Sequence, residues 1–182
     1  MILEEKDYYW FVVTGQYDKQ DLDTMKVKTV KSQVIVRAIN LADLESSALP
    51  YFELLTTSPS SAKITGVKQV EIEKILFNGL TIDNGEVGNS TEITLEDPET
   101  MALFRTKVNF YALDEKSGKL KKASSSDYWV PAVTAVESSE IVSKHLADCT
   151  VDWKIDSISM SKIESILVDN DYLRYIQNDL QA

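Results

Sequence analysis

The stretch ITGVKQVEIEKIL, residues 64–76, decides the fold, because a second version of it, IDSISMSKIESIL, stands at residues 155–167. The identical positions, each pair 91 residues apart, are Ile64/Ile155, Ile72/Ile163, Glu73/Glu164, Ile75/Ile166 and Leu76/Leu167. Each version closes a segment that opens with an aromatic and β-branched strand pattern and continues through a helical pattern. The chain is therefore predicted to consist of two tandem copies of one small module.

The first copy is predicted to run strand, strand, helix, strand. Alternation of apolar and polar residues indicates strands at 8–17, 26–38 and 64–77. Asn40 is a candidate N-cap for a helix at 41–54, because its side-chain oxygen can accept a hydrogen bond from a backbone N–H of the first turn. Pro50 lies inside that helix and is expected to bend or break it, since proline has no N–H to donate.

The second copy repeats this order. Strands are predicted at 102–113, 120–131 and 151–167, and a turn at 114–119, where Gly118 can adopt a left-handed conformation. Thr134 and Glu137 form a capping-box pattern for a helix at 135–147. The last strand is expected to carry a bulge, because its alternation slips between Ile155 and Ile158. Residues 171–180 predict a C-terminal helix that has no counterpart in the first copy.

These patterns predict an α+β protein built by tandem duplication of a strand-strand-helix-strand module, with antiparallel strands and helices on one face. The strands can form one continuous sheet or two packed sheets. The expected division is a first module at 1–77, an acidic linker or insert at 78–101, a second module at 102–168 and the C-terminal helix at 169–182. The expected core residues are Phe11, Val13, Val34, Val36, Leu44, Phe52, Ile64, Ile72, Phe104, Val108, Phe110, Val130, Ile141, Leu146, Ile155 and Ile166.

Composition excludes several classes of protein. The 182 residues are 43% hydrophobic and 26% charged, an ordinary globular composition. No apolar run reaches the roughly 18–20 residues of a membrane span, and the N-terminal residues lack the pattern of a signal peptide. The single cysteine, Cys149, excludes an internal disulfide, so we expect a cytoplasmic location in the host cell. A net charge of −10 argues against tight non-specific binding of duplex DNA by the molecule as a whole.

The charges are nevertheless segregated along the chain. Residues 78–100 carry six acidic residues and no basic one, whereas bases concentrate in the predicted strands. His145, the single histidine, and Cys149 stand four residues apart on a predicted helix, but a nucleophile–base pair or a metal site needs further supporting groups. We therefore predict no enzymatic activity, no cofactor and no metal site.

The segments WFVVTGQYDK (10–19) and RTKVNFYALDEKSGK (105–119), together with the two closing strands, resemble an uncharacterised family. This is domain-of-unknown-function family 4494, small duplicated α+β proteins of Bacteroidota and their phages. The resemblance covers about residues 10–167 and implies a bacterial host cell. It implies neither an activity nor any site residue.

Basic and aromatic residues share the predicted strands, and this combination is typical of surfaces that bind single-stranded nucleic acid. We predict a non-catalytic nucleic-acid-binding accessory protein of phage or mobile-element type, with single-stranded DNA favoured. The candidate residues are Lys28, Lys31, Arg105, Lys107, Tyr111, Lys119, Lys121, Lys122 and Trp129. The structural explanation of the same residue pattern is an ordinary half-buried sheet, with aromatic residues inside and charged residues outside.

The alternative function is a protein-interaction or assembly protein, or a host-directed phage factor, without nucleic-acid binding. Its strand edges or its C-terminal helix would bind a protein partner or a second copy of the chain.

Overall fold

The computed structural model describes residues 7–77, 85–95, 97 and 99–181. The chain forms two compact units. Unit 1 comprises residues 1–70, 82–94 and 163–182, and unit 2 comprises residues 71–81 and 95–162. Each unit contains its own sheet and helices, so the predicted α+β class is confirmed, and the strands form two sheets.

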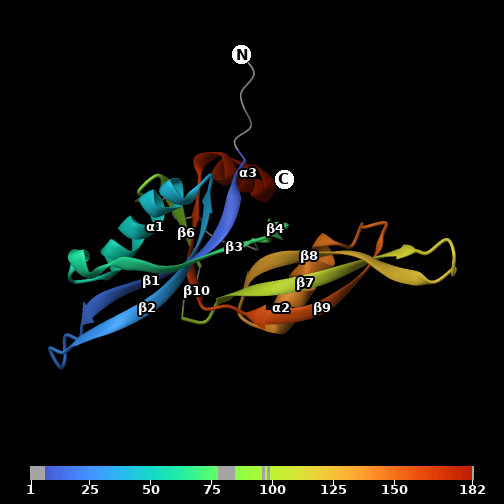
Figure 1. The fold of residues 1–182 in the computed structure, drawn as a ribbon. Coiled ribbons are helices and arrows are strands. Elements are labelled where there is room, and N and C mark those ends of the chain that lie inside the picture. Colours follow the sequence, from blue (N-terminus) through green and yellow to red (C-terminus); the bar gives the residue numbers. More distant parts are fainter. Residues whose placement is uncertain (1–6, 78–84, 96, 98, 182) are drawn as a thin grey trace, which may run out of the picture. The chain divides into compact units, whose positions relative to one another are not determined.

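Unit 1 is built on a six-stranded sheet with the order β3-β1-β2-β10-β6-β5 (Figure 1). The strands are β1 (Tyr9–Gln20), β2 (Val27–Ala38), β3 (Lys63–Val70), β5 (Gly85–Val87), β6 (Ser90–Thr94) and β10 (Ile163–Val168). β10 is parallel to β2, and the other pairs are antiparallel. The remaining elements are α1 (Leu41–Leu55), the short 3-10 helix η1 (Pro59–Ser61) and α3 (Asn170–Gln181).

α1 covers one face of this sheet because alternate residues of β1 and β2 present an apolar surface to it. Phe11, Val13 and Tyr17 of β1 are buried in one cluster with Leu44 and Phe52 of α1. The predicted cap is confirmed, since the Asn40 side chain accepts a hydrogen bond from the Asp43 N–H at 2.9 Å. Alternation therefore predicted both the strands and the face that they bury.

Pro50 does not break α1, which was one of the two effects expected of it. The helix continues to Leu55, although Pro50 has no N–H for the Ser46 carbonyl four residues earlier. The backbone of Gly88, between β5 and β6, lies against that carbonyl, and an added Cβ at Gly88 would be 2.0 Å from the Ser46 oxygen. The Ser46 carbonyl, which cannot accept a hydrogen bond from Pro50, thus faces the β5–β6 turn.

Unit 2 is built on a four-stranded sheet with the order β4-β8-β7-β9. The strands are β4 (Lys74–Ile75), β7 (Ala102–Leu113), β8 (Leu120–Ala132) and β9 (Asp152–Met160), and α2 (Ala135–His145) covers one face (Figure 1). The predicted N-cap is confirmed, since Thr134 accepts from the Glu137 N–H at 3.1 Å; the Glu137 carboxylate accepts from the N–H of Val133, the residue before the cap, at 2.7 Å and not from Thr134 as in a strict capping box. The predicted bulge is confirmed, since the register of β7 and β9 shifts between Ile155 and Ser157.

The predicted closing strands at 64–77 and 151–167 are wrong as single strands. The first is two strands, β3 in the sheet of unit 1 and β4 in the sheet of unit 2. The second is β9 in unit 2 followed by β10 in unit 1. Each predicted closing strand is therefore divided between the two units: the second part of the first one, β4, belongs to unit 2, and the second part of the other one, β10, belongs to unit 1. For this reason the bounds of the two units differ from those of the expected modules. Alternation along one strand reports the face that is buried, but it carries no information on the neighbouring strand.

The segment predicted as an acidic linker also contributes to a sheet. Its described part contains β5 and β6, and β6 pairs with β10. Residues 78–84 of that segment lie outside the described residues. The segment predicted as an acidic linker or insert therefore contains two sheet strands in its described part.

The two units share strand order and register in their common part. The equivalent pairs are Phe11/Gln69 with Phe104/Met160, Val13/Val67 with Thr106/Ile158, and Ile35/Ile166 with Trp129/Ile75. The register shifts also correspond, at Thr14/Gly15 in β1 and at Lys107/Val108 in β7. The repeat seen in the sequence is therefore matched in topology, and its origin by duplication stays a prediction.

Candidate nucleic-acid interface

The face of the four-stranded sheet opposite α2 contains most of the predicted binding residues of unit 2, and we call it the outer face. β7 contributes Arg105, Lys107, Asn109 and Tyr111 to it, because the alternate residues Phe104, Val108 and Phe110 pack in the α2 core. Residues directly opposite one another in a sheet share a face. The positions opposite these four are Trp129, Asp127, Ser125 and Lys122 of β8, and Ser159, Ser157, Lys154 and Asp152 of β9.

One end of the outer face is acidic. The Arg105 guanidinium donates to the Asp127 carboxylate through Nε at 2.9 Å and through Nη2 at 2.6 Å. Beside this pair is a polar pocket of about 280 Å³, lined by Glu71, Ile72, Glu73, Arg105, Lys107, Ser125, Ser126 and Asp127. Three carboxylates surround two basic groups there. Arg105 is therefore neutralised by its own sheet and is poorly placed to bind a phosphate.

The other end of the outer face is basic. Tyr111 is partly exposed, and it lies directly opposite Lys122 on β8; Lys154 on β9 lies opposite Asn109, two residues before Tyr111 on β7. Lys122 and Lys154 are both exposed. Asp152 is the acidic residue opposite Tyr111 at this end. The basic end therefore consists of one aromatic ring with Lys122 opposite it and Lys154 on the diagonal, whereas Lys107 lies opposite Asp127 at the acidic end.

The β7–β8 hairpin extends beyond α2 and ends in the predicted turn (Figure 1). Gly118 has a φ of 65°, as expected for a left-handed turn residue. Lys121 pairs with Asp114 at 2.7 Å, and the hydrogen bonds from Lys121 and Ser117 hold the pKa of the Asp114 carboxyl below its usual value. Lys119 remains exposed at the tip. Of the three lysines predicted at this hairpin, Lys119, Lys121 and Lys122, Lys121 is thus already paired with a carboxylate.

Two predicted residues belong to unit 1 and do not share a face. Lys28 lies opposite Lys19, and Lys31 lies opposite Gln16 in the β1–β2 pair. Positions three apart on a strand point to opposite sides of the sheet. Lys28 and Lys31 therefore cannot both contact one ligand lying on one face of this sheet.

Trp129 is removed from the candidate set by its burial. Its side chain is 5% exposed, and β4 pairs with β8 at this position, opposite Ile75. A base can stack only on an accessible ring face. The indole N–H of Trp129 is buried without a hydrogen-bond partner among the described residues. Lys154, in contrast, was missed by the sequence reasoning, although alternation along the predicted last strand could have placed it.

His145 is the last residue of α2, and Cys149 follows it before β9. The His145 ring packs against the Tyr128 ring, with centroids 5.6 Å apart, and Cys149 is exposed. Burial raises the pKa of Tyr128. Within the described residues, no group of three or more histidine, cysteine or acidic side chains could hold a metal ion.

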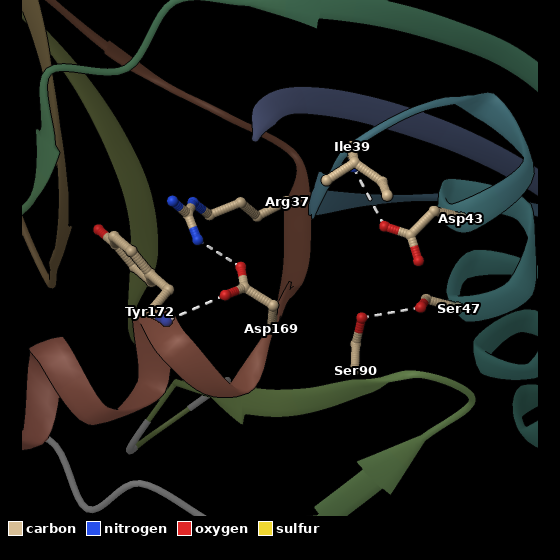
Figure 2. A network of polar contacts seen from close by, with 7 residues as sticks. All are labelled: Arg37, Ile39, Asp43, Ser47, Ser90, Asp169 and Tyr172. Carbon is tan, nitrogen blue, oxygen red and sulfur yellow. Dashed lines mark hydrogen bonds and ion pairs between the residues drawn. The ribbon is translucent and has the colours of Figure 1, made fainter. Parts of the chain in front are cut away.

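A polar cluster in unit 1 holds α3 on the sheet, and sequence reasoning missed it. Figure 2 shows Arg37 of β2 paired with Asp169, whose other carboxylate oxygen accepts from the Tyr172 N–H at 3.0 Å. The Arg37 guanidinium also lies 4.3 Å from the ring centre of Tyr8 and 4.8 Å from that of Tyr172. Arg37 is thus enclosed by its own chain, and no local sequence signal links it to residues more than a hundred positions later.

A second contact in Figure 2 joins the first residue of β6 to α1. The Ser90 hydroxyl donates to the Ser47 hydroxyl at 2.7 Å, and both side chains are buried. In unit 2, Thr106 and Ser138 form the corresponding kind of contact between a strand and α2, at 2.8 Å. These contacts satisfy buried hydroxyl groups and have a structural role.

Comparison with known proteins gives a family. None of the helices in the described residues is both long enough and apolar enough to cross a membrane. No curated protein matches the chain. A family model described as "Domain of unknown function (DUF4494)" matches residues 9–169, which confirms the family resemblance seen in the sequence. The chain therefore belongs to this family.

Proposed function

We propose that this protein is a non-catalytic nucleic-acid-binding accessory protein of phage or mobile-element type, and that it prefers single-stranded DNA. The proposal is supported by the basic end of the outer face, where Lys122 of β8 lies directly opposite Tyr111 and Lys154 of β9 lies diagonally to it, opposite Asn109. An accessible aromatic ring offers a stacking platform to any base, and the flanking ammonium groups offer contacts to phosphates.

The charge distribution favours a single strand over a duplex. At the basic end of the outer face the cations are Lys122 and Lys154, while the chain as a whole has a net charge of −10. A duplex presents more phosphates over a wider surface and would be repelled by the rest of the molecule. The Arg105–Asp127 end of the face, with Glu71 and Glu73 beside it, would stop the strand from extending in that direction.

The magnitude of the salt dependence follows from the number of lysines. Two phosphate contacts on single-stranded DNA, from Lys122 and Lys154, give a slope of log K against log[salt] of about −1.4. Stacking on Tyr111 is expected to contribute about 1–3 kcal/mol. The affinity should therefore be measurable at low salt and should decrease strongly as salt increases.

The test is fluorescence anisotropy with a labelled oligo-dT of twenty nucleotides, measured over a range of salt concentrations. We expect Tyr111→Ala and Lys122→Ala each to weaken binding, and Lys122→Ala also to make the salt slope less steep by about 0.7. Lys144→Ala, a matched loss of one lysine on α2 at the opposite face, should bind as the unmodified protein does. No binding by the unmodified protein at low salt, or equal weakening by Lys144→Ala, would refute the proposal.

The alternative function, protein docking without nucleic-acid binding, has one observation in its favour. It is the groove beside β3 in unit 1, which is lined mainly by apolar side chains. That groove shares no residue with the outer face of unit 2, so variants of the two sites separate the two functions.

A further inference from the structure

The face of the unit 1 sheet away from α1 carries three exposed lysines, Lys31 of β2 and Lys63 and Lys68 of β3, which we call the lysine cluster. Lys31 and Lys63 lie directly opposite Gln16 of β1, one on each side of it. Tyr17, the next residue of β1, packs in the α1 core, and successive side chains of a strand point to opposite faces. Gln16 and the two lysines opposite it therefore point away from α1.

The spacing of the lysine cluster is set by the sheet. Neighbouring strands lie about 4.8 Å apart, so the backbones of Lys31 and Lys63 are about 10 Å apart across β1. Lys68 lies opposite Val12, four residues before Gln16 on β1, which places it about 13 Å further along the strands. The cluster thus extends over the length of about four nucleotides, at a stacked spacing of about 3.4 Å.

The lysine cluster is not neutralised by acidic side chains of its own sheet. Asp18 is the only acidic residue in the sequences of β1, β2 and β3. It lies beyond Gln16, on the side away from Lys68, and its carboxylate accepts a hydrogen bond from the Thr29 hydroxyl at 2.9 Å. Among the described residues, none of the three lysines forms an ion pair. Their charges are therefore available to an anionic ligand, unlike that of Arg105.

The helix α3 covers a different part of the same face. Its Tyr172 ring lies 5.1 Å from the ring centre of Trp10 and 4.8 Å from the Arg37 guanidinium. Trp10 and Arg37 lie opposite each other, six residues along β1 and β2 from the Gln16–Lys31 pair. The end of the face with the lysine cluster therefore offers cations but no free aromatic ring.

Unit 2 has a corresponding arrangement on its outer face. Lys154 of β9 lies opposite Asn109 of β7, as Lys63 of β3 lies opposite Gln16 of β1. Lys63 and Lys154 are both exposed, and each directly precedes one of the two repeated stretches of the sequence. The repeat therefore presents a lysine beside an amide side chain at the same position of both sheets. In unit 2 this lysine belongs to the proposed nucleic-acid interface.

We propose that the lysine cluster is a second nucleic-acid contact, which binds the phosphates of a single strand independently of the outer face of unit 2. The inference rests on the proposed function, because it assigns the same ligand to a second surface. Three phosphate contacts give a slope of log K against log[salt] of about −2, steeper than the value of about −1.4 for the outer face. Since the cluster has no free ring for stacking, it binds without preference among bases.

An anionic membrane fits the lysine cluster less well than a single strand does. Membrane-binding clusters usually contain about four to eight basic residues, whereas this cluster has three. The net charge of −10 also opposes the approach of the whole molecule to an extended negative surface. A single strand can contact the cluster without approaching the acidic parts of the chain.

The test is NMR of the ¹⁵N-labelled protein, titrated at low salt with an oligo-dT of eight nucleotides. Each backbone amide reports binding close to it, so the two surfaces are observed separately. We expect one set of shifts around Gln16 in unit 1 and another around Tyr111 in unit 2, which saturate with different dissociation constants. Added salt should weaken the unit 1 set more steeply, with slopes of about −2 and about −1.4.

Two matched double variants identify the site. Lys31→Ala with Lys63→Ala removes two charges from the cluster, and it should abolish the unit 1 shifts while the unit 2 shifts remain. Lys19→Ala with Lys28→Ala is the control, because these exposed lysines lie opposite each other on the α1 side of the same sheet. The control should retain both sets of shifts. Circular dichroism establishes that each variant is folded.

Three results would overturn the inference: unit 2 shifts without unit 1 shifts, unit 1 shifts that persist when Lys31 and Lys63 are replaced, or an equal loss in the Lys19 and Lys28 control. Unit 1 shifts that appear with phosphatidylserine vesicles and not with the oligonucleotide would also overturn it, and would assign the cluster to a membrane surface. If neither set of shifts appears, the proposed function fails together with the inference. If the unit 2 set appears by itself, the inference alone fails.

Discussion

The contact between Gly15 and Phe52 gives the sharpest prediction for stability. Phe52 of α1 is fully buried, and its ring lies over the backbone of β1 at Gly15. A Cβ at Gly15 would be 2.4 Å from three carbons of that ring. Carbon atoms pack at about 3.5–4.0 Å, so Gly15→Ala requires the ring to move by more than about 1 Å in a closed core. The position therefore tolerates only glycine while Phe52 is present.

The expected loss of stability for Gly15→Ala is about 1–3 kcal/mol, as for other overpacked cores. With a urea m-value of about 2 kcal/mol/M, the midpoint of unfolding should decrease by about 0.5–1.5 M. Urea titration followed by circular dichroism measures this shift. Gly66→Ala is the matched control, because its added Cβ would be 3.6 Å from the Thr14 Cβ, an ordinary contact distance.

A double-mutant cycle then tests the cause. Phe52→Leu removes the ring and is itself destabilising, but it also removes the obstacle to the new methyl group. The double variant should therefore be more stable than the sum of the two single effects by about 0.5–3 kcal/mol. If Gly15→Ala unfolds at the same urea concentration as Gly66→Ala, or if the two substitutions are simply additive, the packing argument is refuted.

Two further predictions concern unit 2. Ser138→Ala should destabilise the protein by about 1–3 kcal/mol, because it leaves the buried Thr106 hydroxyl without its hydrogen-bond partner at 2.8 Å. The double variant with Thr106→Val should recover much of the lost free energy of unfolding in chemical denaturation. If the double variant recovers none of it, this account is contradicted. Asp114 should titrate below its ordinary pKa of 3.8 in NMR, and its pKa should increase in Lys121→Met, since the Lys121 hydrogen bond is the largest cause of the shift. Because the pKa of Asp114 is lowered in the folded protein, the stabilisation that Asp114 gives to the turn is present above pH 3.8 and is lost as the pH falls through the folded pKa. An unchanged pKa of Asp114 in Lys121→Met would show that Lys121 is not the cause of the shift.

Local features were predictable because they depend on neighbouring residues. The Asn40 and Thr134 caps, the turn at Gly118 and the buried faces of β1 and β7 follow from side chains a few positions apart. The repeat of 64–76 at 155–167 also predicted that the two halves share one order of elements, and the matched registers of β1–β3 and β7–β9 agree with it.

Part of the candidate site was predictable for the same reason. Lys107 and Tyr111 share a face of β7 because they are an even number of residues apart. The neutralisation of Arg105 by Asp127, in contrast, was not predictable from nearby residues, because it depends on the pairing of two strands. The burial of Trp129 depends on the addition of β4 to the sheet of unit 2.

Tertiary structure alone decided which strands became neighbours. The sequence determined that residues 64–77 and 151–167 are extended and apolar, but each divides between two sheets, with β4 joining β8 and β10 joining β2. The Arg37–Asp169 pair and the groove between α1 and β3 likewise join residues that no short sequence window contains. The physical reason is that periodicity fixes which side of a strand is buried, whereas the choice of neighbour depends on the free energy of the whole packed sheet.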